Sequence, residues 1–266
     1  MARLQYNHPA DNLAALATLS LAGFTAQAAY PLANLVDLNP ANPFKANEQT
    51  GRVIIDHGTA KAIALVALIH HNLDAALSVK FQANATDSWG APSFSQAFTI
   101  GAKDTDGYRP NTYLDLSGAP PTFRYHSLFV EGTNTLDVIL GELWLGSTIR
   151  TIVHNYSWGF RRADVRPGRK QWTTPSGVDW TYPSQGRRRG LTGSVDTSDA
   201  GVAALSAWSQ AAGGLDQPVL IIPGAPDITD ALLAKWTVDF EYTGEFIGVN
   251  PMAVGWLELA RGVPWP

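Results

Sequence analysis

The chain has 266 residues, of which 45% are hydrophobic and 16% charged, so it is long enough for one large or two ordinary domains. Its net charge of −4 argues against a general nucleic-acid binder, and its lack of cysteine excludes disulfides, thiolate nucleophiles and cysteine-ligated metals. Nine Trp, eight Tyr, 24 Gly and 17 Pro favour short strands and tight turns over long helices.

Near the N-terminus, the apolar run 13–24 precedes Ala26-Gln27-Ala28, which has the form of a signal-peptide cleavage site. Only Arg3 is basic before this run and Asp11 lies close to its start, so the pattern favours a structural segment over a secretory signal. No apolar run approaches the roughly 20 residues that a membrane-spanning helix needs, and we therefore expect no membrane insertion. Residues 10–20 are expected to form a short helix or a first strand.

The strongest element signal lies between residues 50 and 73. Two apolar runs, 53–55 and 62–69, flank a polar break in which Gly58 can supply a positive φ at little cost. The second run is apolar at odd and even positions alike, which predicts a strand buried on both faces. A short buried helix also fits eight apolar residues, but the β-branched members favour a strand.

Later segments of the first half also predict strands. Residues 77–83 alternate between apolar and polar, which is typical of a half-exposed strand. Further strands are expected at 94–100, 125–130 and 136–145, and the loops between these strands are rich in aromatic and polar residues.

Several short motifs around the central stretch resemble the discoidin-like, galactose-binding type of β-sandwich. Asp56-His57-Gly58 stands where a strand of that family closes on a turn, and His71-Asn72-Leu73 where the next buried strand ends. Residues 30–37 are similar to its opening loop and residues 141–146 to its last strand. The resemblance covers about residues 12–148 and implies a jelly-roll β-sandwich, for which carbohydrate binding is the familiar activity.

The charge pattern changes after Ser147. Residues 150–190 carry nine basic and two acidic side chains, a balance of +7, and residues 191–266 carry two basic and nine acidic, a balance of −7. We therefore expect two domains, 1–148 and 149–266.

The second half predicts mainly strands and one helix. Ser198 or a neighbouring residue can cap a helix at about 200–212, which Gly213-Gly214 would end. At most one helical turn is expected at 229–233. Strands are expected at 156–165, 179–182, 191–196, 219–222, 236–242 and 254–259.

A β-sandwich with one helix and paired long strands is similar to the tail-tube-like fold of phage tail tubes, distal tail proteins and ring-forming hub proteins. Joined to a discoidin-like sandwich, this architecture resembles phage tail-tip and baseplate proteins. The resemblance implies a homo-oligomeric ring, with tail-tube and hub proteins as partners. It also implies a location in the virion after synthesis in the bacterial host cytoplasm.

No nucleophile, zinc-binding or nucleotide-binding motif is present, and the six histidines are too scattered for a metal motif. We therefore expect no catalytic residue, no metal and no cofactor. Asp104 and Asp106 share a Gly/Tyr loop, which leaves open a glycosidase pair or a Ca²⁺ site, although a solvated loop is the favoured interpretation.

Four loop residues are candidates for contact with a glycan, because sugars stack on exposed aromatic rings and bond to nearby polar groups. They are Trp89, Tyr108, Arg109 and Tyr113. The alternative is that these side chains cover the sandwich or contact another subunit.

The run Arg187, Arg188 and Arg189 has three interpretations. It can contact phosphate, form a solvated turn, or meet the acidic C-terminal segment of a neighbouring copy. Because a head-to-tail ring needs two complementary patches on each subunit, we assign these arginines to a subunit interface.

These patterns predict a non-enzymatic virion structural protein of a phage tail tip or baseplate. It would form a ring or adaptor and present an outward β-sandwich for docking or for contact with a host-surface glycan, without specific nucleic-acid binding. The alternative is a bacterial carbohydrate-binding adhesin or accessory module. A hydrolase with an unrecognised site is the third option.

Overall fold

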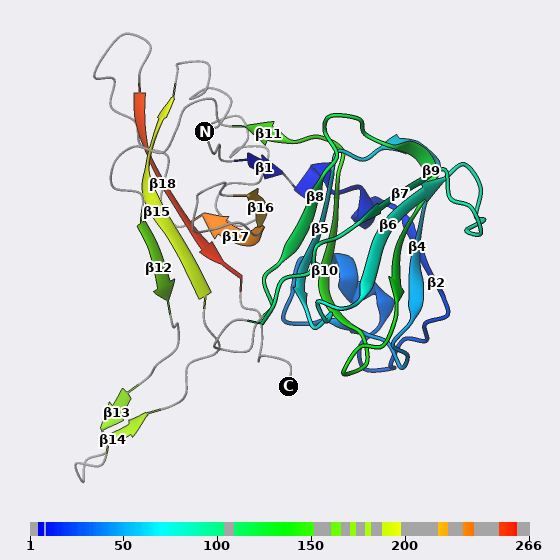
Figure 1. Cartoon of the computed structure of the whole chain (residues 1–266). Helices are drawn as coiled ribbons and strands as arrows, with labels where there is room; N and C mark the ends of the chain where they lie inside the picture. Colours follow the sequence, from blue (N-terminus) through cyan, green and yellow to red (C-terminus); the bar gives the residue numbers. More distant parts are fainter. Residues whose placement is uncertain are drawn as a thin grey trace.

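The computed structural model describes residues 5–7, 9–103, 109–151, 161–165, 171–173, 179–181, 188–197, 218–222, 231–236 and 250–259. The described strands form antiparallel sheets of seven, five, four and two strands (Figure 1). Within these ranges the only helical elements are 3-10 turns, so the prediction of a mainly β protein is confirmed. The helix predicted at 200–212 lies outside the described residues.

The first half is a β-sandwich of two sheets. The five-stranded sheet has the order β2 (Thr18–Ala22), β4 (Gly51–Ala62), β9 (Thr122–Glu131), β6 (Ser78–Asn84) and β7 (Phe94–Ala97). The four-stranded sheet has the order β3 (Phe44–Lys45), β10 (Ile139–Gly146), β5 (Leu65–His71) and β8 (Thr112–Asp115). Three 3-10 turns complete this half: η1 (Pro9–Asp11), η2 (Leu13–Leu16) and η3 (Leu32–Val36).

Alternation along the strands builds the core between the two sheets. Ile55 of β4, Phe81 of β6 and Leu128 of β9 are fully buried, and they pack in one cluster with Leu68 of β5. Burying a large apolar side chain contributes roughly 1.5–3 kcal/mol, so this cluster stabilises the sandwich.

The central stretch folds as two long strands. Every residue of β5 is buried, which confirms the prediction of a strand covered on both faces. The sequence predicted that the polar break at 56–59 separates two strands. In the structure β4 runs through this break and continues to Ala62, with an irregularity in its pairing between Asp56 and Lys61. Gly58 has a φ of +70°, as expected for a glycine in such a bulge.

The other strands of the sandwich lie close to their predicted positions. The strands predicted at 77–83, 94–100, 125–130 and 136–145 correspond to β6, β7, β9 and β10. The segment 10–20 combines both expectations for it, since η1 and η2 are followed by the start of β2.

The seven-stranded sheet belongs mostly to the second half of the chain. Its order is β11 (Arg150–Thr151), β1 (Gln5–Asn7), β16 (Val219–Ile222), β17 (Leu232–Trp236), β18 (Asn250–Glu258), β15 (Arg188–Thr197) and β12 (Arg161–Val165). β1 comes from the N-terminal end of the chain and lies between β11 and β16. A separate two-stranded sheet holds β13 (Gln171–Thr173) and β14 (Asp179–Thr181), away from the sandwich in Figure 1.

One local prediction in this sheet is wrong. Residues 229–233 were expected to form at most a helical turn, but Leu232 and Leu233 begin β17. Their backbones pair with Ile221 and Leu220 of β16, and both side chains are buried. Tertiary pairing thus overrides a weak local preference.

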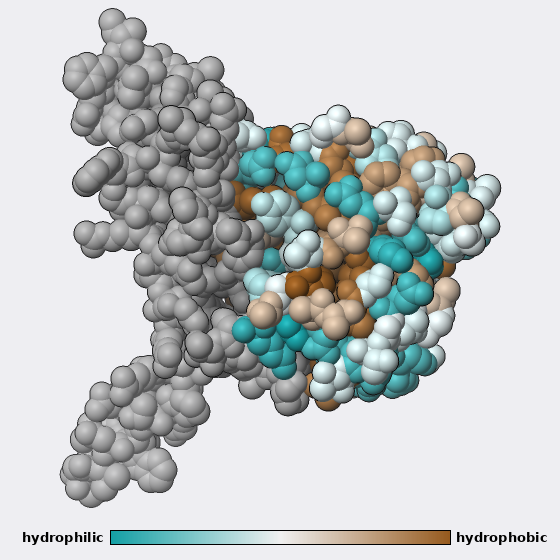
Figure 2. Space-filling model, viewed as in Figure 1, coloured by the Kyte–Doolittle hydropathy of each residue, from teal (hydrophilic) through white to brown (hydrophobic). Residues whose placement is uncertain are grey.

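The two halves share a second apolar core. It lies on the outer face of the four-stranded sheet, where β16 and β17 cover β5 and β10 (Figure 1). Its buried members are Leu65, Ala67, Ile69, Trp144, Leu220, Ile222, Ala231 and Leu233. This core therefore covers only one of the two outer faces of the sandwich. On the side of the sandwich that Figure 2 shows, hydrophobic and hydrophilic residues are interspersed.

Polar bonds accompany this interface. The Trp144 indole N–H donates to Asn7 Oδ1 at 2.6 Å, and Asn7 in turn donates to the Thr148 carbonyl. Asn111 Nδ2 donates to the Ala231 carbonyl at 2.7 Å. Because Asn7 and Asn111 are buried and bonded, the interface is specific as well as apolar.

Candidate functional site

Trp89 lies in the loop between β6 and β7 and holds an arginine on the outer face of the five-stranded sheet. The Cζ atom of Arg52 lies 4.6 Å from the Trp89 ring centroid and 4.4 Å from that of Phe129. The Trp89 indole N–H donates to Asp87 Oδ1 at 2.7 Å, which fixes the ring. We call Arg52, Trp89 and Phe129 the Arg52 cluster.

Neighbouring strands position this arginine. Arg52 of β4 is in register with Phe129 of β9, and Gln82 of β6 with Ser127 of β9. Arg52 Nη1 donates to Gln82 Oε1 at 2.5 Å and to Ser127 Oγ at 2.6 Å. Arg52 is only 8% exposed, and burial lowers the pKa of its guanidinium while the charge of Asp87 acts in the opposite direction.

The other candidate glycan residues that the structure describes, Arg109 and Tyr113, do not join Trp89. Arg109 forms an ion pair with Asp74, and its Nη1 donates to the Gly101 carbonyl at 3.1 Å. Tyr113 of β8 is half-buried and packs against the core shared with the second half. Trp89 and Tyr113 therefore lie over opposite outer faces of the sandwich. Tyr108 lies outside the described residues.

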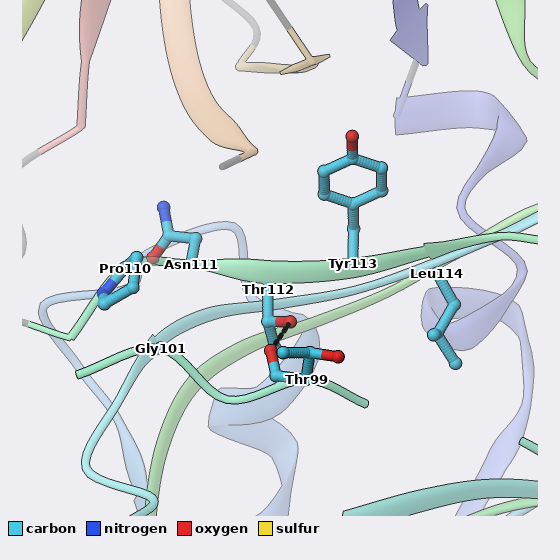
Figure 3. A pocket seen from close by; sticks show the side chains of 7 residues that line it. All are labelled: Thr99, Gly101, Pro110, Asn111, Thr112, Tyr113 and Leu114. Atoms are coloured by element: carbon cyan, nitrogen blue, oxygen red, sulfur yellow. Dashed lines mark hydrogen bonds between the residues drawn. The ribbon is translucent and has the colours of Figure 1, made fainter. Parts of the chain in front are cut away.

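A cleft of about 430 Å³ lies beside β8, the last strand in the order of the four-stranded sheet. In Figure 3, Asn111 and Tyr113 point to one side of β8, whereas Thr112 and Leu114 point to the other. The Thr112 hydroxyl donates to the Thr99 carbonyl at 3.0 Å. The described lining is completed by Gly101 and Pro110.

The described lining of the cleft offers polar contacts. It presents hydroxyl, amide and phenol groups, and no carboxylate, imidazole or amine side chain among the described residues. Hydroxyl, amide and phenol groups can form hydrogen bonds with a small polar ligand.

The described residues hold no group of three His, Asp or Glu side chains that could bind a metal ion. Asp104 and Asp106, the candidates for a carboxylate pair or a Ca²⁺ site, lie outside these residues. None of the described helices is both long and apolar enough to cross a membrane.

Three histidines contribute to the interior of the sandwich, where His70 and His126 are buried and His57 is half-buried. The His126 ring stacks on Phe81 with 5.5 Å between centroids, and His57 meets it edge-on at 5.1 Å. His70 Nδ1 lies 2.7 Å from the Pro40 carbonyl oxygen. Burial lowers the pKa of all of these imidazoles, so they are neutral at pH 7.

Glu142 is a buried acid that the sequence interpretation missed, because it stands inside the apolar run of β10. Its Oε2 accepts the Leu38 N–H at 3.0 Å, whereas Oε1 is buried without a hydrogen-bond partner among the described residues. Burial, aided by the charge of Asp37, raises the pKa of Glu142 to about 9. A neutral carboxylic acid therefore lies in the same four-stranded sheet as the interdomain core.

Part of the arginine run falls within β15. Arg188 is paired in register with Val165 of β12, and Arg189 with Asp164. Arg187 and the side chains of Arg188 and Arg189 lie outside the described part of the chain, so the assignment of all three to a subunit interface stays a prediction.

Comparison with known proteins gives fold similarity alone. No family model and no curated protein sequence matches the chain. Among solved structures, a fucose-binding module of Streptococcus pneumoniae matches 50% of this chain and 96% of its own, at 10% identity and a TM-score of 0.39. A chitosan-binding module from a Paenibacillus chitosanase/glucanase matches 50% of this chain and 97% of its own, at 17% identity and a TM-score of 0.35.

Larger enzymes also contain the similar part. A Ruminococcus gnavus GH29 fucosidase matches 51% of this chain at 16% identity and a TM-score of 0.38, but the match spans only 26% of the fucosidase chain. Structural similarity to discoidin-like, carbohydrate-binding-module β-sandwiches thus extends over about half of the chain.

Proposed function

We propose that this chain is a non-enzymatic structural protein of a phage tail tip or baseplate. In this proposal the second half is a tail-tube-like sandwich that forms a homo-oligomeric ring, and the first half faces tail or hub partners. The observation that carries the proposal is the join between the halves, in which Trp144 is fully buried against β16 and β17.

Rigid joining favours an assembly role over a tethered module. Domains within one chain usually move relative to each other unless their interface is large and hydrophobic. Here the interface is an apolar core, β1 pairs with β16, and Asn7 bonds to Trp144 across it. A sandwich held in this way keeps a fixed direction, which an assembled particle requires and a sugar-binding module on a linker does not.

The charge pattern supports a ring. The balance of +7 over residues 150–190 and −7 over residues 191–266 provides two complementary segments on each copy. Head-to-tail contacts between such segments close into rings when the rotation allows it.

The native mass of the purified chain, measured by light scattering at low and high salt, tests this proposal. We expect an oligomer that dissociates as salt rises, because salt screens charge pairs at a surface. The variant Arg187→Glu/Arg188→Glu/Arg189→Glu should be monomeric at salt concentrations where the wild type is not. A monomeric wild type at every concentration, or a variant that assembles normally, would contradict the ring.

A carbohydrate-binding adhesin or accessory module is the second candidate function. The half-buried Trp89 over the outer face and the polar cleft beside Tyr113 favour it. We expect wild-type protein to bind immobilised glycans, with at least tenfold weaker binding after Trp89→Ala or Tyr113→Ala, since ring stacking is lost. Whichever variant fails identifies the face that binds, and a wild type that binds no glycan rejects this candidate.

A further inference from the structure

Arg52 is a buried cation that has no acidic partner among the described residues. The other arginines with described side chains, Arg109, Arg124 and Arg150, each form an ion pair with an aspartate. No carboxylate among the described residues forms an ion pair with Arg52, although it is only 8% exposed. A buried charge is costly unless it is paired, so this site is electrostatically incomplete.

The open side of the guanidinium has a defined geometry. Nη1 is occupied by Gln82 and Ser127, and the rings of Trp89 and Phe129 hold the group in place. Nε and Nη2 make no hydrogen bond to the described residues. They are also not among the unbonded polar atoms that are fully buried, so both keep some contact with solvent. Nε and Nη2 together form the planar fork that binds a carboxylate through two parallel hydrogen bonds.

We propose that Arg52 binds the carboxylate of an acidic sugar on the outer face of the five-stranded sheet. Hydroxyl and amide groups that suit sugar hydroxyls surround it on the same side. Gln82 Nε2 donates to the exposed Ser95 hydroxyl at 3.3 Å, and the Ser93 hydroxyl donates to Asn84 Oδ1 at 2.9 Å. Ligand binding at Arg52 does not require the protein to be oligomeric.

Two nearby charges set the selectivity. Lys80 lies on β6, but Glu131 neutralises it in an exposed pair at 3.4 Å, so Arg52 supplies the main positive charge. Asp87 lies near enough to influence Arg52 without forming an ion pair, and it would repel a bound anion. Asp87→Asn keeps an oxygen acceptor for the Trp89 N–H and removes this repulsion.

A calorimetric titration of the full chain with methyl glucuronide and methyl glucoside tests the proposal, because these probes differ only in the carboxylate. We expect the wild type to bind the glucuronide at least tenfold more tightly than the glucoside. Arg52→Lys should remove that preference, since an ammonium lacks the fork, and Asp87→Asn should increase it several-fold. Arg124→Lys, an exposed arginine already paired with Asp56, is the matched control and should change nothing.

Equal affinity of the wild type for the two probes would overturn the proposal. So would an Arg52→Lys variant that keeps the full preference for the glucuronide. Acetate that competes as well as the glucuronide would reduce the site to a simple anion site and overturn its assignment to sugars. Asp87→Asn keeps the test valid if Arg52→Lys fails to fold, because Asp87 is exposed and outside the core. Light scattering of the same samples separates this result from failure of the proposed assembly.

Discussion

Acidification from pH 7 to pH 4 is expected to unfold the sandwich, because it contains four histidines in the neutral form. Burial lowers the pKa of His57 and His70 to about 4, and that of His71 and His126 to about 3. An unfolded histidine has a pKa of about 6.5. Below that value the unfolded chain therefore takes up protons that the folded chain does not.

The contribution of these groups to stability is fully present above pH 6.5 and is lost as the pH falls toward 4 and then 3. Between pH 6.5 and its folded-state pKa, each neutral histidine lowers the free energy of unfolding by about 1.4 kcal/mol per pH unit. The half-buried His57 contributes less, because solvent screens it. At pH 5 the four together remove several kcal/mol, which is comparable with the roughly 5–15 kcal/mol that stabilises a typical domain. Urea unfolding followed by circular dichroism at pH 7, 6 and 5 measures this loss.

His126→Phe separates the titration from simple core packing. The His126 ring is fully buried and stacks on Phe81, so phenylalanine keeps an aromatic contact and removes the proton site. We compare the free energy of unfolding of the variant with that of the wild type. The difference in favour of the variant should be about 2 kcal/mol larger at pH 5 than at pH 7. Val79→Ala is the control, because it removes buried apolar volume and should lower stability equally at both values. A pH trend unchanged in His126→Phe would contradict the role of this histidine.

Most strands of the sandwich could be predicted because their signal is local. β5 is apolar at every position and β6 alternates, and both patterns follow directly from which faces are buried. β17 could not be predicted, because its pairing with β16 depends on contacts outside the local sequence. The insertion of β1 beside β16 has the same cause, since it joins residues more than 200 positions apart.

The candidate site was only partly predictable for a related reason. Trp89 was identified by its type and loop position, but Arg52 directly precedes the apolar run 53–55, which predicts only core residues. Its importance arises from Phe129, Gln82 and Ser127, which reach it from other strands. Arg109 was a plausible ligand residue in the sequence, yet its pair with Asp74 gives it a structural role.

Glu142→Gln is expected to stabilise the protein at neutral and alkaline pH. The Glu142 side chain is fully buried and its pKa is about 9, whereas an unfolded glutamate titrates near 4.3. Between these values unfolding releases a proton, so the wild type loses stability steadily as the pH rises and loses no more once the pH exceeds about 9. Glutamine matches the shape of the neutral acid and still accepts the Leu38 N–H, but it has no proton to lose.

We expect Glu142→Gln and the wild type to be equally stable near pH 4.5, and the variant to be more stable by about 3 kcal/mol at pH 7. The measurement is urea unfolding of both proteins from pH 5 to pH 9. Glu131→Gln, which removes a carboxylate from an exposed ion pair with Lys80, should change stability by less than about 1 kcal/mol throughout. Parallel pH profiles for Glu142→Gln and the wild type would show that the buried carboxyl is not neutral. The buried acid lowers stability as the pH rises, whereas the neutral histidines lower it as the pH falls. Together the two effects place the stability maximum near pH 6 to 7.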